Sequence, residues 1–333
     1  MTDYDMRAGG RRPSPLSLRM TLTLSAAMAL IDRTLGIGPL LADHPREPED
    51  AHFERLRHAF EELCGVEGCL QMALNPTHAF DPDGLETHPR TIAWHIAQLG
   101  ATRVLELGSG AGFNTLLLAR DHPGVTFVGL DPLPRHRDLA RARARDRGIA
   151  NARFEVGRLD KPGAGGGDFD LVFGVERLGQ SPDIDRLLAA VAGVMRPGGR
   201  YLHFDTFLHE DIADQPRAMV EALRLHEGAE ARAGGFRTLS AWHRAIGQAG
   251  LVVRRDQDLT ANILPLLLRS QARAAAALGR TRRRADPRPP PTPDGRALAA
   301  ALVAPLLYCG PGPQPMPPLG MLRYVKIVAH RPR

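Results

Sequence analysis

The chain contains few residues of the kinds that cross-link a fold or anchor it in a membrane. Cys64, Cys69 and Cys309 are the only cysteines among 333 residues, and they form neither an even disulfide framework nor a zinc-ligand spacing. We therefore expect reduced thiols and a cytoplasmic location. No apolar run reaches the length of about 20 residues that a membrane-spanning helix needs. The sequence thus predicts no membrane span.

Aromatic side chains are also scarce, and this limits how the net charge of +6 can be interpreted. Arginines concentrate in residues 135–147, a predicted helix with a solvated outer face, and in residues 280–296, a proline-rich stretch expected to be flexible. A basic surface is typical of nucleic-acid binding. However, four tyrosines and two tryptophans offer little for stacking bases. We predict no nucleic-acid partner and keep a nucleic-acid substrate as the alternative.

From residue 91 onward, short apolar strands alternate with helices. The predicted strands are 103–107, 126–130, 152–156, 169–173, 200–204, 251–255 and 321–329, with helices at 91–99, 114–120, 135–147, 184–195, 216–226, 239–249 and 263–278. Alternation of this kind implies βαβ units and a mostly parallel sheet. We therefore predict a Rossmann-like, doubly wound α/β fold with seven strands, the last one inserted antiparallel.

Residues 1–90 are predicted to form a helical extension ahead of this main domain, residues 91–333. Phe53, Leu56, Phe60 and Leu63 recur at the spacing of an amphipathic helix. Their apolar stripe must be buried, so we expect the extension to close over the ligand face of the sheet as a lid. Packing behind the sheet or in a homodimer interface is the competing interpretation. A helical cap is expected at about residues 206–240.

A glycine-rich loop stands between the strand at 103–107 and the next helix. It reads Glu106-Leu-Gly-Ser-Gly-Ala-Gly112, and its glycines let the backbone turn tightly and approach a ligand closely. Dinucleotide-binding loops prefer G-x-G-x-x-G, which seats a pyrophosphate. Here the spacing is G-x-G-x-G, and Glu106 would repel phosphates but suit a cationic amino-acid ligand.

An acidic residue follows the second strand. Asp131 comes 19 residues after Gly112, and an acid at this place can hydrogen-bond both hydroxyls of an adenosine ribose. The alternative is a turn-forming aspartate before Pro132.

Four blocks of the sequence together resemble class I S-adenosylmethionine-dependent methyltransferases of the small-molecule branch, akin to the ubiquinone and tocopherol types. They are VLELGSGAGFNTLLLAR (104–120), VGLDP (128–132), FDLVFGVERL (169–178) and RLLAAVAGVMRPGGRYLHFD (186–205). Their order and spacing match that family, and the resemblance covers roughly residues 90–255 and the final strand.

The resemblance implies a set of cofactor contacts. The loop residues Glu106, Gly108, Ser109, Gly110 and Gly112 would line the methionine and sugar moieties. Asp131 would hold the ribose, Pro132 would flank the adenine, and Gly174 and Val175 would face the cofactor. The family usually has an aspartate after the third strand, where this chain has Arg158. Asp160, or the backbone near Leu159, is expected to take that adenine contact.

The implied reaction moves a methyl group from S-adenosylmethionine to a small organic acceptor, a secondary metabolite or an isoprenoid-like compound, leaving S-adenosylhomocysteine. RNA or another nucleic acid is the alternative acceptor. Candidate bases at the ends of strands are Glu176, Asp205 and His209. Glu176 could instead order the cofactor loop, and His209 could be an ordinary surface histidine. No metal is predicted, because residues 174–177 lack the aspartate of catechol-type enzymes. Methylation at carbon, nitrogen or oxygen stays open.

Overall fold

The computed structural model describes residues 22–42, 58–65, 69–162, 167–210, 212, 214–230, 234–281, 295–310 and 320–333. Within these ranges lies a seven-stranded sheet of order β3-β2-β1-β4-β5-β7-β6. Strands β1 to β5 pair in parallel, and β7 is antiparallel to both β5 and β6. The strands are β1 (Arg103–Leu107), β2 (Thr126–Asp131), β3 (Ala152–Val156), β4 (Phe169–Val175), β5 (Met195–Leu208), β6 (Val252–Asp258) and β7 (Leu322–His330). The predicted fold class and the antiparallel last strand are confirmed.

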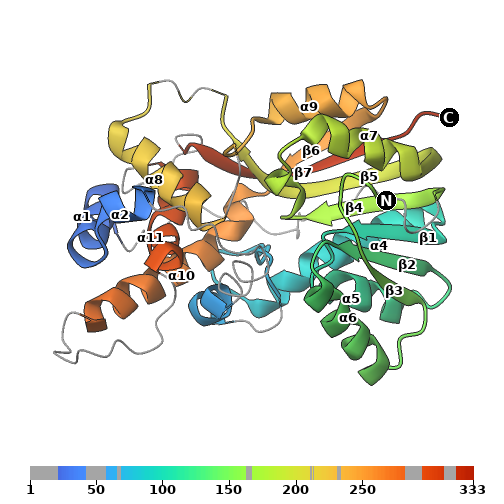
Figure 1. Cartoon of the computed structure of the whole chain (residues 1–333), viewed down its shortest axis with the longest axis horizontal. Helices are drawn as coiled ribbons and strands as arrows, with labels where there is room; N and C mark the ends of the chain where they lie inside the picture. The colour runs from blue at the N-terminus through green and yellow to red at the C-terminus, as the bar shows by residue number, and fades with distance from the viewer. Residues whose placement is uncertain are drawn as a thin grey trace.

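Helices cover both faces of the sheet (Figure 1). α4 (Thr87–Leu99) and α5 (Phe113–Asp121) pack on one face, where Ile92 and Leu118 join Val104 of β1 in one core. α7 (Ile184–Val194) and α9 (Leu239–Gln248) pack on the other, where Trp242 joins a second core. α6 (Pro134–Asp146) lies against β3. Because the central strands are covered on both faces, β4 is buried along its whole length and is apolar except for Asp170.

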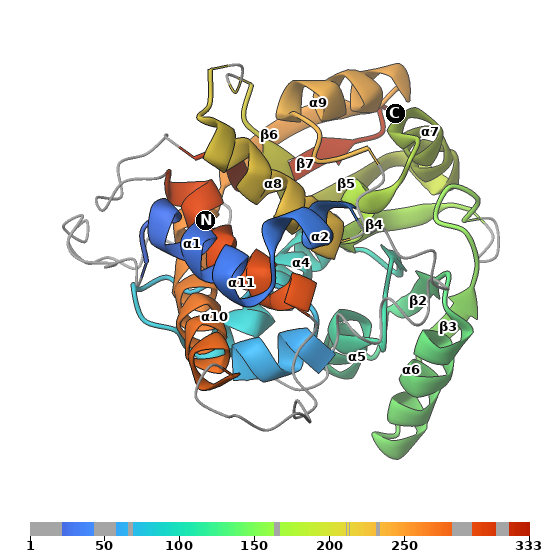
Figure 2. The same ribbon diagram turned by 60° about the vertical axis from the view of Figure 1, so that its left-hand side comes forward.

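A second group of helices lies beside the edge at which the parallel strands end. It contains α1 (Leu24–Thr34), α2 (Ile37–Ala42), α8 (Arg217–Ala229), α10 (Thr260–Thr281) and α11 (Gly295–Cys309). Figures 1 and 2 show these helices gathered together, the blue N-terminal pair against the orange and red C-terminal pair. α11 contacts α8, α10 and α1. We call these five helices the helical layer. It extends well beyond the predicted cap at 206–240, because α10 and α11 between β6 and β7 also belong to it.

The segment from residue 69 to residue 81 differs from the expected helical extension. It contains no helix, and it is followed by a short 3-10 helix at Pro82–Glu86. Hydrogen bonds to distant elements hold it: the Leu74 amide donates to Gly84 O (2.9 Å), and the Asn75 amide donates to Asn262 O of α10 (2.9 Å). Upstream, Phe60 and Leu63 are at least partly buried, whereas Phe53 and Leu56 lie outside the described residues. Tertiary contacts, rather than helical periodicity, therefore shape residues 69–81.

Two boundaries also differ from the sequence-based expectation. Residues 196–199 were expected to end α7 but lie inside β5, because the helix passes directly into an extended backbone at Met195. The pairing of β4 with β5 then shifts register between Phe169 and Leu171. α10 begins at Thr260, so Pro265 lies beyond its first turn. The described part of the 280–296 stretch is the end of α10 and the start of α11, and residues 282–294 lie outside the described ranges.

Length and hydropathy together decide whether a helix can cross a bilayer. Every helix in the described ranges is too short or too polar to span a bilayer.

Candidate functional site

The glycine loop between β1 and α5 adopts a backbone that favours glycine at three positions. Gly108, Gly110 and Gly112 have φ angles of 78°, 51° and 85°, in the left-handed region. The amides of Gly108 and Ser109 donate to Leu130 O at 2.7 and 3.1 Å, which ties the loop to the end of β2. A Cβ at Gly108 would collide with the side chain of Arg177, whereas one at Gly110 would meet no atom within 4 Å. Gly110 therefore borders open space.

Asp131 supports this loop from the end of β2. The side chain is buried, and its Oδ2 accepts the Gly110 amide at 3.0 Å. Its Oδ1 accepts the Leu133 amide at 3.0 Å and lies 3.0 Å from His136 Nδ1. Burial alone would raise the pKa of Asp131, but the hydrogen bond and charge of His136 and the Leu133 amide outweigh it, so the pKa is lowered. The carboxylate stays ionised and keeps lone pairs for further donors.

Glu106 lies at the start of the loop and is buried as well. It accepts hydrogen bonds from Asn114 Nδ2 (3.0 Å), from the Thr115 amide (3.2 Å) and from the Thr115 hydroxyl. Burial raises its pKa to about 7, and these hydrogen bonds act against the rise. The same Asn114 amide group donates to Gln71 Oε1 at 2.9 Å, and Gln71 Nε2 donates to Leu85 O at 2.7 Å. The loop is thereby joined to the segment at 69–75.

A cavity of about 230 Å³ opens beside these groups. Its walls come from the glycine loop, the start of α5, α6, the end of β4 and the segment at 69–71. The lining residues are Cys69, Leu70, Gln71, Glu106, Gly108, Ser109, Gly110, Ala111, Phe113, Asn114, Arg135, His136, Leu139, Arg143 and Val175. Asp131 lies behind this wall, bonded to Gly110 and His136. Of the predicted cofactor residues, Glu106, Gly108, Ser109, Gly110 and Val175 therefore share one cavity.

The other predicted cofactor residues do not line this cavity. A Cβ at Gly112 would crowd Phe154 and Ala140, and one at Gly174 would crowd Leu178, so both glycines allow close packing. The Asp160 carboxylate pairs with Arg158 at 2.8 Å and with Arg186 at 2.9 Å. Pro132 and Leu159 are also absent from the cavity wall.

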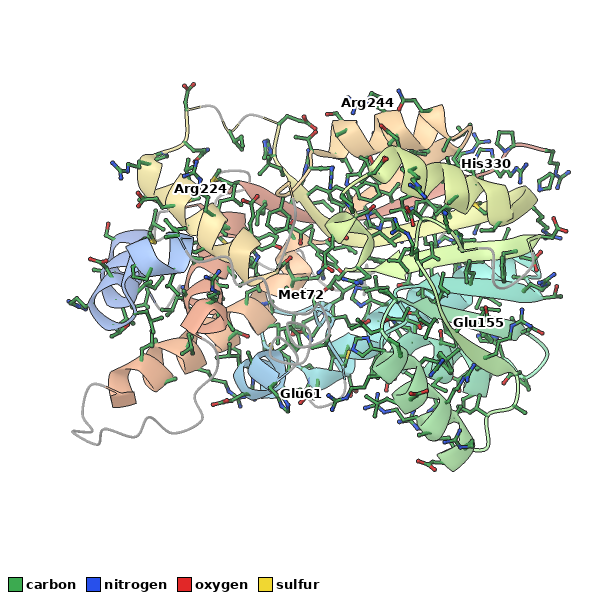
Figure 3. The ribbon with its side chains drawn as sticks, viewed as in Figure 1. Glu61, Met72, Glu155, Arg224, Arg244 and His330 are labelled. Carbon is green, nitrogen blue, oxygen red and sulfur yellow. The ribbon has the colours of Figure 1, made fainter. Side chains whose placement is uncertain are left out.

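Glu176 follows β4 and has a left-handed backbone with φ 55°, which is unusual for a residue other than glycine. Its Oε1 accepts two hydrogen bonds, from the Met72 amide at 2.8 Å and from the Tyr324 hydroxyl at 2.6 Å. Figure 3 labels Met72 between the helical layer and the sheet. Burial of the carboxyl group raises the pKa of Glu176 to about 8, although both hydrogen bonds act to lower it. Strained residues of this kind are common at functional sites.

Tyr324 and His88 extend this contact through the interior. Tyr324 lies in β7, and its hydroxyl is 2.9 Å from Nε2 of His88 in α4. Both side chains are fully buried. Neither residue was predicted from the sequence, because Tyr324 reads as one more apolar strand position and His88 carries no motif. Gln71 and Met72 carry no motif either, and they were likewise not predicted.

The other two candidate bases are arranged differently. Both oxygens of the buried Asp205 accept backbone amides, Oδ2 from Gly179 at 2.9 Å and Oδ1 from Thr206 at 2.8 Å. Its charge helps to raise the pKa of Glu176. His209 is partly exposed and is tied to Met321 O through its backbone amide at 2.8 Å. Within the described ranges, no three His, Cys, Asp or Glu side chains are grouped as a metal site requires.

Part of the chain is similar to known methyltransferases. Residues 104–199 match a family model described as a methyltransferase domain. A fatty-acid O-methyltransferase from Mycolicibacterium smegmatis is 33% identical over 126 residues, which are 38% of this chain and 45% of that protein. A trans-aconitate 2-methyltransferase from Deinococcus radiodurans is 35% identical over 130 residues, 38% of this chain and 47% of that protein. The chain thus spans about half the length of these curated relatives.

Solved structures share the fold over most of the chain. The [4+2]-cyclase SpnF superposes with a TM-score of 0.64 at 16% identity, covering 85% of this chain and 95% of that one. A geranyl diphosphate C-methyltransferase from Streptomyces coelicolor superposes with a TM-score of 0.57 at 17% identity, covering 87% and 100%. At these identities the likeness concerns the fold, and it agrees with the predicted fold class.

Proposed function

We propose that this chain transfers a methyl group from S-adenosylmethionine to a small organic acceptor. Its residues 104–199 match a methyltransferase domain, and we assign this domain to the class I, S-adenosylmethionine-dependent type. The observation that carries the proposal is the single cavity shared by the glycine loop, Glu106 and His136, with Asp131 directly behind. Two buried acids beside a glycine loop suit a cationic ligand that contains a ribose.

The residues at the cavity fit this cofactor. The lone pairs left on Asp131 suit the ribose hydroxyls, and open space at Gly110 allows close approach of a ligand to the backbone. Glu106 and the amides of Gln71 and Asn114 suit the charged amino-acid end. Glu106 lines the cavity together with Arg135 and Arg143, so the argument against a dinucleotide rests on the G-x-G-x-G spacing of the loop. For the adenine contact we propose Pro132 and the backbone at Leu159 and Asp160, because the Asp160 carboxylate is already paired with Arg158 and Arg186.

S-adenosylmethionine supplies an electrophilic methyl group on a sulfonium and leaves as S-adenosylhomocysteine. The protein aligns the acceptor with the sulfur–methyl bond and takes up the acceptor's proton where one must leave. Glu176 is the best-suited base among the three candidates, because Asp205 commits both oxygens to backbone amides whereas Glu176 receives its bonds on Oε1 alone.

The acceptor is proposed to be largely apolar, a secondary metabolite or an isoprenoid-like compound. The helical layer beside the strand ends contributes leucine, alanine and valine side chains to the core. Apolar surroundings of this kind suit an apolar acceptor molecule. The relative named after a fatty acid supports this class. We also propose a cytoplasmic protein without a nucleic-acid partner, and a homodimer as a state to be tested by sedimentation.

Calorimetry with S-adenosylmethionine and S-adenosylhomocysteine, followed by an acceptor screen with labelled methyl groups, tests the proposal. We expect saturable binding of both ligands and label in an apolar metabolite. Absence of binding would overturn the cofactor assignment. Label in RNA, with RNA affinity that falls steeply with salt, would instead support the nucleic-acid alternative.

A further inference from the structure

Three side chains from distant parts of the chain, two of them fully buried, form one line of hydrogen bonds. Glu176 follows β4, Tyr324 belongs to β7 and His88 belongs to α4. The separations are 2.6 Å between Tyr324 Oη and Glu176 Oε1 and 2.9 Å between Tyr324 Oη and His88 Nε2. Val175, the neighbour of Glu176, lines the cofactor cavity. The line therefore ends one residue away from the wall of the cofactor cavity.

The donors along this line can be assigned from the chemistry. The Tyr324 hydroxyl donates to the carboxyl group, so its oxygen is left to accept a hydrogen bond from His88. His88 therefore carries its proton on Nε2, with Nδ1 bare. Burial lowers the pKa of His88 to about 3 and raises that of Tyr324 well above 10, so both groups stay neutral. The direction of the hydrogen bonds is fixed toward Glu176.

The two hydrogen bonds that Oε1 accepts fix the orientation of the Glu176 carboxyl group. The Met72 amide and the Tyr324 hydroxyl both approach Oε1, and neither bond uses Oε2. The residue keeps partial exposure. Tyr324 itself is held in place through its backbone, whose amide donates to Thr260 Oγ1 at 3.0 Å.

We propose that Tyr324, supported by His88, is a positioning residue that holds Glu176 by Oε1 so that Oε2 takes the proton from the methyl acceptor. The inference rests on the proposed function. In the step, the acceptor atom forms a bond to the methyl carbon while its own proton passes to Oε2. The sulfur–methyl bond breaks, and its electron pair stays on the sulfur of S-adenosylhomocysteine. Glu176 then returns the proton to solvent, so that charge and atoms balance.

The same geometry narrows the acceptor to compounds that must lose a proton on methylation, such as a hydroxyl or an activated carbon. A carboxylate acceptor needs no base, and neither does an amine that is already neutral.

Several charged or titratable groups surround Glu176 and bear on any pH measurement. Besides Tyr324 and His88 they are Asp205 from β5, Glu230 next to α8, the thiols of Cys64 and Cys69, and Tyr308 of α11 through Tyr324. Asp205 and Glu230 raise the pKa of Glu176. The hydrogen bond from Tyr324 lowers it, so its loss has a predictable sign.

The experiment compares Tyr324→Phe with the wild type by carbon-13 NMR of protein labelled at the glutamate carboxyl carbons. The Glu176 signal is identified by its absence in Glu176→Gln. Because Tyr324→Phe removes a donor from the ionised carboxylate, we expect the Glu176 midpoint to rise by about one pH unit or more. An unchanged midpoint would overturn the proposal. This readout needs no acceptor, so it is independent of the proposed function.

Tyr201→Phe is the matched control. Tyr201 is a fully buried tyrosine of the same sheet, and its hydroxyl has no hydrogen-bond partner among the residues that the structure describes. Its removal should leave both the Glu176 midpoint and turnover unchanged. If Tyr201→Phe moves the midpoint as far as Tyr324→Phe does, a general packing effect is responsible and the proposal fails.

Turnover of an acceptor found in the labelled screen completes the test. We expect Tyr324→Phe to lower kcat about 10- to 100-fold, less than the roughly 10²- to 10⁴-fold loss of a general base because Glu176 itself remains. The rise of activity should move to higher pH, and S-adenosylmethionine affinity should stay unchanged. His88→Phe should act in the same direction, and His88→Gln, which retains a donor, should restore part of the activity. A midpoint that moves while kcat and its pH profile stay the same would contradict the catalytic role. Failure of the wild type to bind the cofactor would refute the proposed function instead.

Discussion

Asp131 combines burial, three hydrogen-bonding partners and a lowered pKa in one side chain. Because it holds the loop through Gly110 and faces the ribose in our proposal, Asp131→Ala should weaken S-adenosylmethionine binding by about 1–3 kcal/mol, the range for hydrogen bonds to a charged group. Isothermal calorimetry measures this. An unchanged affinity would refute the ribose assignment.

Asp160 offers a matched aspartate for the same measurement. Its carboxylate is already paired with Arg158 and Arg186, whereas Asp131 accepts the amide of Gly110, a residue of the cavity wall. We expect Asp160→Ala to bind the cofactor as tightly as the wild type. A loss comparable to that of Asp131→Ala would instead favour the adenine contact suggested by the family resemblance.

Glu106 should make stability depend on pH in a defined window. Its folded pKa is about 7 against an ordinary value of 4.5, so the folded state holds this proton more tightly. Its contribution is complete below about pH 4.5 and is lost as pH rises through about 7. The side chain of Glu106→Gln cannot ionise. Between pH 4.5 and 7 the unfolding free energy of the wild type should therefore fall by about 3 kcal/mol more than that of the variant.

Denaturant titrations across this pH range measure the difference for Glu106→Gln. Any constant offset caused by the substitution drops out, because only the slope with pH matters. Parallel curves for the variant and the wild type would show that Glu106 titrates near its ordinary pKa in the folded protein.

At the scale of elements, the segment at 69–75 links the cofactor loop to Glu176. Gln71 bonds Asn114 and Leu85, and the next residue, Met72, bonds Glu176. Gln71→Leu should lower stability by about 1–3 kcal/mol, because it leaves buried polar groups without partners, and should also weaken cofactor binding, because Gln71 lines the cavity.

Gln271 of α10 provides the comparison for Gln71. It is fully buried, and its Nε2 donates to Leu302 O at 2.8 Å, away from the cavity wall. Gln271→Leu should lose similar stability in thermal unfolding yet bind S-adenosylmethionine normally. Equal losses of affinity in the two variants would mean that the segment at 69–75 has no special connection to the cofactor.

The elements that the sequence predicts well are those with a strong local pattern. β1 and β3 have the expected bounds. β1 is an apolar run that specifies a buried strand, whereas β3 is an edge strand in which only Phe154 is buried. α11 was missed because it is apolar on nearly every side, with Leu302, Val303, Leu306 and Leu307 all buried, and such a helix shows no amphipathic period. Residues 69–81 were placed in a helical region because their partners lie far away in the sequence.

The candidate site divides in the same way. The glycine loop and Asp131 were predictable because their spacing along the chain encodes their chemistry. Glu176 was predictable as a polar residue at a strand end. Tyr324, His88 and Gln71 were not predictable, because only folding brings them to their partners. Tyr324 is 148 residues from Glu176 in the sequence, His88 is 236 residues from Tyr324, and Gln71 is 43 residues from Asn114.

For the whole molecule, the helical layer joins the first described helix to the later ones. α1 buries Leu24, Ala27, Met28 and Ile31 in the same core as α8, α10 and α11. The cavity is lined instead by residues from 69 onward. Removing residues 1–42 should therefore lower the thermal midpoint and acceptor turnover but preserve S-adenosylmethionine affinity.

Calorimetry and turnover of the shortened protein decide between the interpretations of the N-terminal region. Lost acceptor turnover with retained cofactor affinity supports a role on the acceptor side. Full turnover with an altered sedimentation coefficient would favour the dimer-interface interpretation, and lost cofactor affinity would place these helices over the cofactor itself.

The position of β7 between β5 and β6 also governs the order in which the chain can fold during synthesis. β6 ends at Asp258 and β7 begins at Leu322, so a ribosome makes α10 and α11 before the strand that joins β5 to β6. Until then β5 has a free edge, which is prone to pairing with other chains. Chains arrested before residue 320 should thus be protease-sensitive at β6 and prone to aggregate, while β1 to β4 are already paired. Tyr324 therefore reaches Glu176 only late in the synthesis and folding of the chain.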